Sequence, residues 1–140
     1  MVPGDHRGGW ISVDAVKHVQ SGFFLEWLNH LRSQSNQGLF AVGEYWSYHL
    51  EVLMHFIETT NEQIMLFDAS LYYNFSDASQ QGKDYDLRKT FDGALVQERP
   101  ELAVTLVSNH DTQPLQSLES VVVASQKVFC QSMNHRASCN

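Results

Sequence analysis

Short apolar runs alternate with segments of helical periodicity through the middle of this chain, and this alternation limits the possible folds more than any other feature. The clearest strand candidate is Leu102 to Val107, where Val104, Thr105 and Val107 are β-branched. Strands that alternate with helices pair in parallel through right-handed crossovers, so the sequence predicts the α/β fold class. Three further runs predict strands: Val13 to Val16, Leu39 to Gly43 and Ile64 to Phe67.

Apolar residues three and four positions apart predict a helix in each of the three gaps between these strands. Each set places its apolar side chains on one helix face, which would turn toward the sheet. Glycine or proline stands between several of these elements, where regular structure is expected to end. The sets are Phe24, Trp27, Leu28 and Leu31 after Ser21; Leu50, Leu53, Met54 and Ile57; and Leu87, Phe91 and Leu95 after Gly82.

The net charge of the chain limits the kinds of molecule that we expect it to bind. The 140 residues include 9 Lys+Arg and 16 Asp+Glu, for a formal net charge of −7. We expect no nucleic-acid partner and no membrane surface, because phosphate binding needs clustered cations. Apolar runs fall short of the ~18–20 residues of a membrane span. The opening MVPGDHRGGW lacks the apolar stretch of a secretory signal, which favours a cytoplasmic location, and the oligomeric state stays open.

Three acidic residues stand at or just past the ends of three predicted strands. They are Asp14 in VDAVKH, Glu44 in VGEYW and Asp111 in VSNHDT. In parallel α/β folds the loops that leave the carboxyl ends of the strands build one cleft. Converging carboxylates suit the cleavage of glycosidic bonds, which needs a nucleophile and an acid/base. Acidic residues at strand ends also serve as helix N-caps, so the spacing alone leaves both interpretations open.

These motifs resemble three of the four short signature regions of the alpha-amylase family, glycoside hydrolase family 13. The resemblance is to the liquefying and intracellular alpha-amylases of bacteria and fungi, and it covers roughly residues 13–120. It implies a partial TIM (β/α)8 barrel with about strands four to seven, since a complete barrel needs about 250 residues. Residues 1–12 and 121–140 are a divergent N-terminal segment and a divergent C-terminal tail. They suggest a misread gene boundary, a retained intron or a pseudogene.

The resemblance also implies a reaction, the retaining endo-hydrolysis of α-1,4-glucosidic bonds in starch or glycogen. Asp14 would be the nucleophile that forms the glycosyl-enzyme. Glu44 would be the general acid and then the general base. Asp111 would hold sugar hydroxyls and stabilise the transition state. The isolated chain is expected to have little or no activity, because the rest of the barrel is absent from it.

By the same resemblance, four residues would bind the α-glucan. His110 would hydrogen-bond the sugar, Lys17 and His18 would line the leaving-group side, and Trp46 would stack on a glucose face. The main-chain oxygen of His18 would also bind a structural calcium ion. Without the resemblance, Lys17 is a solvated charge, His18 a loop histidine and Trp46 a core aromatic. Only one of the adjacent Tyr45 and Trp46 can face the cleft.

The chain departs from the family pattern beside the predicted nucleophile. The family places an arginine two residues before it, and Ser12 stands there in this chain. Residues two apart on a strand share a face, so an arginine would pair with the Asp14 carboxylate. Serine offers one hydrogen bond and no charge, which predicts a weakened nucleophile.

Other functions are left open. The first is a non-catalytic α-glucan-binding module, or a pseudogene product, that keeps Lys17, Trp46 and His110 but performs no chemistry. The second is a half-barrel that completes itself as a homodimer. An unrelated flavodoxin-like domain is disfavoured, because VDAVKH has no glycine and cannot form a Gly-rich phosphate loop after the first strand.

Overall fold

A four-stranded, all-parallel sheet organises the molecule. The computed structural model describes residues 9–35, 38–107 and 111 of the chain. The strands lie in chain order, β1-β2-β3-β4, so each crossover moves one position along the sheet. This confirms the predicted α/β class with parallel pairing. The strands are β1 (Trp10–Val13), β2 (Phe40–Gly43), β3 (Met65–Phe67) and β4 (Ala103–Val104).

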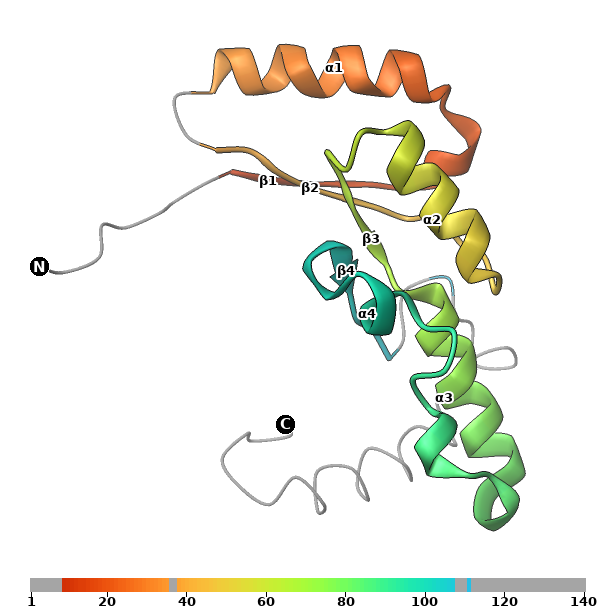
Figure 1. Ribbon diagram of the computed structural model, residues 1–140. Helices are drawn as coiled ribbons and strands as arrows, with labels where there is room; N and C mark the ends of the chain where they lie inside the picture. Colours follow the sequence, from red (N-terminus) through yellow and green to blue (C-terminus); the bar gives the residue numbers. More distant parts are fainter. Residues whose placement is uncertain (1–8, 36–37, 108–110, 112–140) are drawn as a thin grey trace, which may run out of the picture.

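Helices fill the connections between the strands. The first two predicted helices are confirmed as α1 and α2, and Figure 1 shows α1 running along β1 and β2. Helix α3 leaves the end of β3 and extends away from the sheet (Figure 1). In the described part of the chain, every helix is too short or too polar to cross a membrane. The helices are α1 (Ser21–Gln34), α2 (Leu50–Thr59), α3 (Ala69–Gln81) and α4 (Leu95–Glu98), with 3-10 turns η1 (Val16–His18), η2 (Gly82–Asp84), η3 (Leu87–Lys89) and η4 (Pro100–Leu102).

One hydrophobic core joins α1, α2 and α4 to the sheet. Ala41 of β2 and Leu66 of β3 contribute the strand side of this core. Burial of these apolar side chains is the main force that holds helices and sheet together. The helix side comes from Phe24, Leu28, Leu53, Phe56, Ile57 and Leu95, and all six are buried.

Two predicted strands differ from the observed ones by more than one residue at an end. The prediction of Val13 to Val16 is wrong, because β1 ends at Val13 and Val16–His18 forms η1. Ala15 lies between them with φ 49° and ψ 42°, a left-handed conformation that ends the extended chain. The run Leu102 to Val107 contributes only Ala103–Val104 to the sheet.

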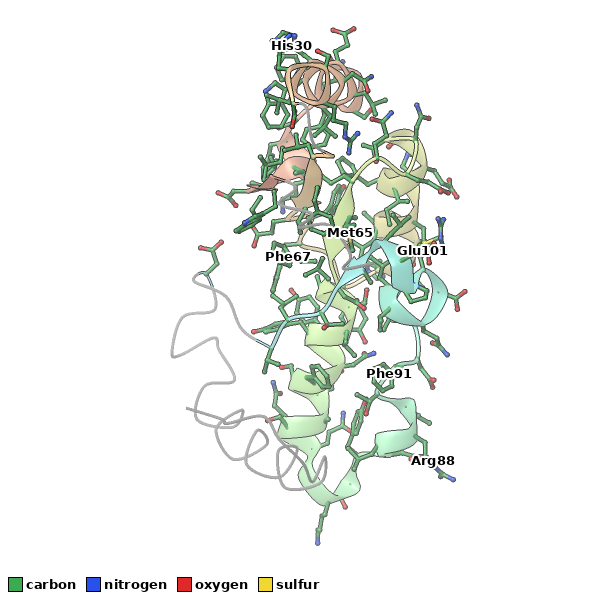
Figure 2. All side chains as sticks on the ribbon, turned by 90° about the vertical axis from the view of Figure 1, so that its left-hand side faces the viewer. His30, Met65, Phe67, Arg88, Phe91 and Glu101 are labelled. Carbon is green, nitrogen blue, oxygen red and sulfur yellow. The ribbon has the colours of Figure 1, made fainter. Side chains whose placement is uncertain are left out.

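The third predicted helix is also wrong. Leu87 lies in the 3-10 turn η3 and Leu95 begins α4, and Gly93 between them has φ 67°. Phe91 is half exposed and lies toward the end of the molecule that carries Arg88 (Figure 2). The long helix of this connection is α3, which starts before Gly82 rather than after it.

Candidate active site

The carboxyl groups of Asp14, Glu44 and Asp111 meet beyond the carboxyl ends of the strands. One oxygen from each lies within 4.8 Å of the other two. Asp14 directly follows β1 and Glu44 directly follows β2, while Asp111 comes seven residues after β4. Parallel neighbouring strands end on the same edge of a sheet, which is why residues so far apart in sequence gather there.

The backbone fixes Glu44 beside the turn that carries Asp14. The N–H of Glu44 donates to the oxygen of Val13 at 2.8 Å, and the N–H of Val16 donates to the oxygen of Glu44 at 3.0 Å. Between these two bonds, Ala15 takes its left-handed conformation and hydrogen-bonds the Glu44 carboxyl through its backbone. A non-glycine residue in this region is strained, and such strain concentrates at functional sites.

Glu44 is in a different electrostatic state from an ordinary surface glutamate. Its residue is only 8% exposed, whereas Asp14 and Asp111 are exposed. Burial raises the pKa of Glu44 most, and a hydrogen bond to Asp14 and the negative charges of Asp14 and Asp111 raise it further. The backbone of Ala15 acts in the opposite direction. A carboxyl with a raised pKa, next to a more exposed carboxylate, is the arrangement that supplies both an acid and a nucleophile.

Ser12 lies on β1, two residues before Asp14. It pairs with Val42 of β2 in the sheet and its side chain is exposed. The position that would hold a cation next to Asp14 is therefore filled by a small neutral side chain.

The structure describes three of the four predicted sugar-binding residues. Lys17 and His18 are exposed in η1, directly after the Asp14 turn. Tyr45 packs on Phe56 of the main core, with ring centroids 5.1 Å apart. Trp46 packs instead in a separate cluster with Tyr72 and Tyr73. Of the two adjacent aromatic residues, Tyr45 is therefore the one that joins the main core. His110 lies outside the described residues.

Trp46 packs against α3 rather than standing alone. Its ring centroid is 5.0 Å from that of Tyr72 and 6.1 Å from that of Tyr73. Tyr72 and Tyr73 therefore pack against the Trp46 ring from α3. Asn74, the next residue of α3, donates from its amide to the oxygens of Thr90 and Asp92, both at 2.9 Å.

One cluster of side chains in the described part of the chain could hold a metal ion. Within residues 9–35, 38–107 and 111, Asp14, Glu44 and Asp111 are the one group of three or more acidic, histidine or cysteine side chains close enough to share an ion. Calcium prefers six to eight oxygen ligands, more than these three groups provide without further donors.

Asp68 has a structural role that the sequence patterns above do not predict. It is fully buried at the end of β3 and caps α3 by accepting from the N–H of Leu71 at 2.9 Å. It also accepts from Leu95 at 3.1 Å and from Val96 at 2.8 Å, in the first turn of α4. An aspartate directly after a strand and before a helix is a recognisable N-cap, which is the signal that could have identified it.

Comparison with known proteins gives close relatives over most of this chain. No protein-family model matches it. Over 110 residues, or 79% of the chain, it is 47% identical to the cytoplasmic alpha-amylase of Escherichia coli K12, 44% to the glucan 1,4-alpha-maltohexaosidase of Bacillus sp. strain 707 and 47% to an alpha-amylase of Geobacillus stearothermophilus. The matched segment covers 22%, 21% and 20% of these proteins, so the chain spans about a fifth of the length of the curated relatives it matches.

Proposed function

Since this chain carries part of an alpha-amylase-family sequence, we propose that it belongs to an enzyme that cleaves α-1,4-glucosidic bonds in starch or glycogen by an endo, retaining mechanism. The observation that carries this proposal is the meeting of Asp14, Glu44 and Asp111 within 4.8 Å, where Glu44 is buried and the other two residues are exposed. In this proposal the four parallel strands are strands four to seven of a (β/α)8 barrel, and residues 13–120 are its catalytic part.

The proposed reaction has two steps. In the first, Glu44 donates its proton to the glycosidic oxygen while the Asp14 carboxylate attacks the anomeric carbon, which breaks the glycosidic bond and forms a glycosyl ester. In the second, the Glu44 carboxylate takes a proton from water, and the water oxygen attacks the same carbon and releases Asp14. Asp111 holds sugar hydroxyls and stabilises positive charge in the transition state.

Two features of the site support these roles. Retaining enzymes hold acid and nucleophile about 5–5.5 Å apart, whereas inverting enzymes need about 6.5–9.5 Å to admit water. One carboxyl oxygen of Asp14 and one of Glu44 lie within 4.8 Å of each other, which is less than the separation that an inverting enzyme needs. The raised pKa of Glu44 favours its protonated form, which is the form that a general acid needs.

In this proposal four further residues contact the substrate. Lys17 and His18 would contact the sugars of the leaving group from η1, His110 would hydrogen-bond the sugar that is attacked, and Trp46 would stack on a glucose face. A relative carries the name cytoplasmic alpha-amylase, and we propose the same compartment for this chain.

Calcium is the cofactor that the family resemblance implies, held partly by the main-chain oxygen of His18. The residues described here do not make such a site on their own. His18 belongs to no cluster of three potential ligand side chains in the described part of the chain, and calcium takes six to eight oxygens. The proposed reaction passes through Asp14, Glu44 and Asp111 only.

Covalent trapping tests the proposal directly. The isolated chain is expected to turn over little or no substrate, but a slowly hydrolysed glycosyl-enzyme accumulates without turnover. On long incubation a fluorinated maltosyl fluoride should therefore label the 140-residue chain, and peptide mass mapping should find the sugar on Asp14. Asp14→Asn should abolish labelling, whereas Glu58→Gln, a change of an exposed acid on α2, should leave it unchanged. Labelling at another residue, or none in the folded chain, would contradict the catalytic role.

A second function is favoured by one observation. Asp14 and Asp111 are exposed in the described structure, and exposure to water weakens the electrostatic stabilisation on which catalysis depends. The alternative is an α-glucan-binding module without chemistry. Maltoheptaose binding that persists in Asp14→Asn, is lost in Trp46→Ala and is accompanied by no hydrolysis would support this alternative over the enzyme.

A further inference from the structure

Four aromatic residues form a continuous run that begins two residues after Glu44. The aromatic run consists of Trp46, Tyr48, Tyr72 and Tyr73. The rings of Tyr72 and Trp46 lie 5.0 Å apart, those of Trp46 and Tyr73 6.1 Å, and those of Tyr73 and Tyr48 5.3 Å. Two members come from the loop after β2 and two from α3, so the run joins the loop of the site to that helix.

Exposure increases along the aromatic run from Tyr72 to Tyr48. Tyr72 is buried, Trp46 and Tyr73 are half-buried, and Tyr48 is 52% exposed. Packing therefore accounts for Tyr72, but it leaves half of Tyr48 in water. An exposed aromatic that is continuous with a substrate site is a surface that a ligand can cover.

The position of Tyr48 is constrained despite this exposure. Its ring meets Tyr73 at an interplanar angle of 63° and His49 at 88°, both edge-type contacts. The N–H of His49 donates to the hydroxyl of Ser47 at 3.1 Å, which fixes the backbone on both sides of Tyr48 just before α2 begins. A ring held in this way loses little conformational entropy when a ligand stacks on it.

We propose that Tyr48 is a second sugar-stacking platform, supported by Tyr73, which extends the glucan site beyond Trp46. This inference rests on the proposed function, because it needs an α-glucan in the site beside Glu44. The occupant is a neutral polymer with apolar sugar faces, which suits both an aromatic ring and a chain of formal net charge −7. The platform makes the chain favour long maltooligosaccharides over short ones.

The test compares two ligands on one set of variants. Calorimetric titration of the 140-residue chain and of its Tyr48→Ala, Tyr48→Phe and Trp46→Ala variants would use maltotriose and maltoheptaose. We expect the wild-type chain to bind maltoheptaose more tightly than maltotriose. Tyr48→Ala should weaken maltoheptaose binding about tenfold with maltotriose unchanged, and Tyr48→Phe should keep most of the affinity. Phe91→Ala, at another half-exposed ring far along the chain, is the matched control and should change neither affinity.

The outcomes separate the inference from the proposed function. If Trp46→Ala weakens both ligands while Tyr48→Ala weakens neither, the proposed site survives and the second platform is overturned. If the folded wild-type chain binds neither ligand, both are overturned. Circular dichroism and thermal unfolding of each variant distinguish lost binding from lost folding, and a Tyr48→Phe variant as weak as a folded Tyr48→Ala variant would also overturn the stacking role.

Discussion

The main-chain N–H of Val16 donates a 3.0 Å hydrogen bond to the main-chain oxygen of Glu44. This bond lies beyond the last residues of β1 and β2, so it extends their pairing into the two loops that carry the candidate acid and nucleophile. Together with the bond from Glu44 to Val13, it holds the Asp14 turn against the end of β2. The geometry of the site therefore depends on how closely the backbone packs at these two strand ends. Substitutions at the strand ends test this dependence.

Gly43→Ala should destabilise the protein by about 1–3 kcal/mol, the usual cost of overpacking a core. A Cβ at Gly43 would lie 2.7 Å from Cδ1 of Ile64, 3.0 Å from Cγ1 of Val16 and 3.2 Å from Cδ2 of Leu66. All three side chains are buried and cannot all move away. Urea unfolding measures the change in the free energy of unfolding.

Gly22→Ala is the matched control for that substitution. An added Cβ at Gly22 meets nothing within 4 Å, and Gly22 lies in the first turn of α1, where alanine favours the helix. We expect a gain of up to about 1 kcal/mol. Equal losses from both substitutions would contradict close packing at Gly43.

Asp68→Ala should cost about 3 kcal/mol or more, because three backbone N–H groups would lose a charged acceptor inside the core. The N-termini of α3 and α4 share this one carboxylate, so both should loosen together. Hydrogen exchange of the amides of Leu71 and Leu95 reports the two helices separately.

The comparison for Asp68 is Asp86→Ala. Asp86 caps η3 by accepting from the N–H of Arg88, but it faces solvent more than Asp68 does. Its removal should cost at most about 1 kcal/mol, the typical value of an exposed cap. If exchange at Leu71 rose in Asp68→Ala while exchange at Leu95 stayed unchanged, the shared role of Asp68 would be wrong.

Glu44→Gln should raise the stability of the protein at neutral pH. Burial, the hydrogen bond to Asp14 and nearby negative charge raise the pKa of Glu44 in the folded state, so folding favours its protonated form. The resulting stability is present below the unfolded pKa of Glu44 and is lost as the pH rises through its raised folded pKa. Glutamine resembles the protonated form of Glu44 at every pH, so the variant should not lose this stability as the pH rises.

Thermal unfolding from pH 3 to pH 8 checks the sign of that effect. The melting temperature of Glu44→Gln should match the wild-type value at the acidic end and exceed it at the neutral end. Glu58→Gln, on the exposed face of α2, should show no such divergence. A Glu44→Gln variant that is less stable than wild type at pH 7 would mean that the ionised Glu44 is stabilised in the fold.

The parallel sheet could be predicted from sequence because its signal is local. Four apolar runs separated by helical periodicity predict parallel pairing, and residues at the carboxyl ends of parallel strands then gather on one edge of the sheet. The position of Glu44 follows from this directly, since it is the first residue after β2. The same argument places Asp14 beside it, although β1 ends three residues earlier than the predicted strand.

Helix α3 was missed because most of it is not amphipathic. Its buried residues are Ala69, Ser70, Leu71 and Tyr72, all in the first turn. The rest is mostly polar, with residues 73–79 half-buried and Gln80 and Gln81 exposed. A helix that begins at a buried cap and then runs into solvent has no 3.6-residue apolar stripe to detect. Its cap, Asp68, depends on α4, which lies 27 residues later in the chain.

Strand β4 is shorter than predicted because its neighbour ends. Phe67, the last residue of β3, pairs with Val104, and the next residue, Asp68, donates its N–H to the oxygen of Val104 before α3 begins. Residues 105–107 therefore have no residue of β3 beside them to pair with. β-Branched composition indicates that a segment can be extended, but the partner strand determines how much of it pairs.

Ser12→Arg should strengthen the candidate nucleophile. Ser12 is exposed on β1 two residues before Asp14, so an arginine there can reach the carboxylate without displacing core side chains. We expect the rate of labelling of Asp14 by the fluorinated maltosyl fluoride to rise at least severalfold, since an ion pair holds the carboxylate charged and oriented for attack. Ser33→Arg adds the same charge at an exposed position of α1 and should leave that rate unchanged. If both variants accelerate labelling equally, the effect is one of net charge, and if Ser12→Arg gives no gain in a folded chain, the missing cation is not what limits Asp14.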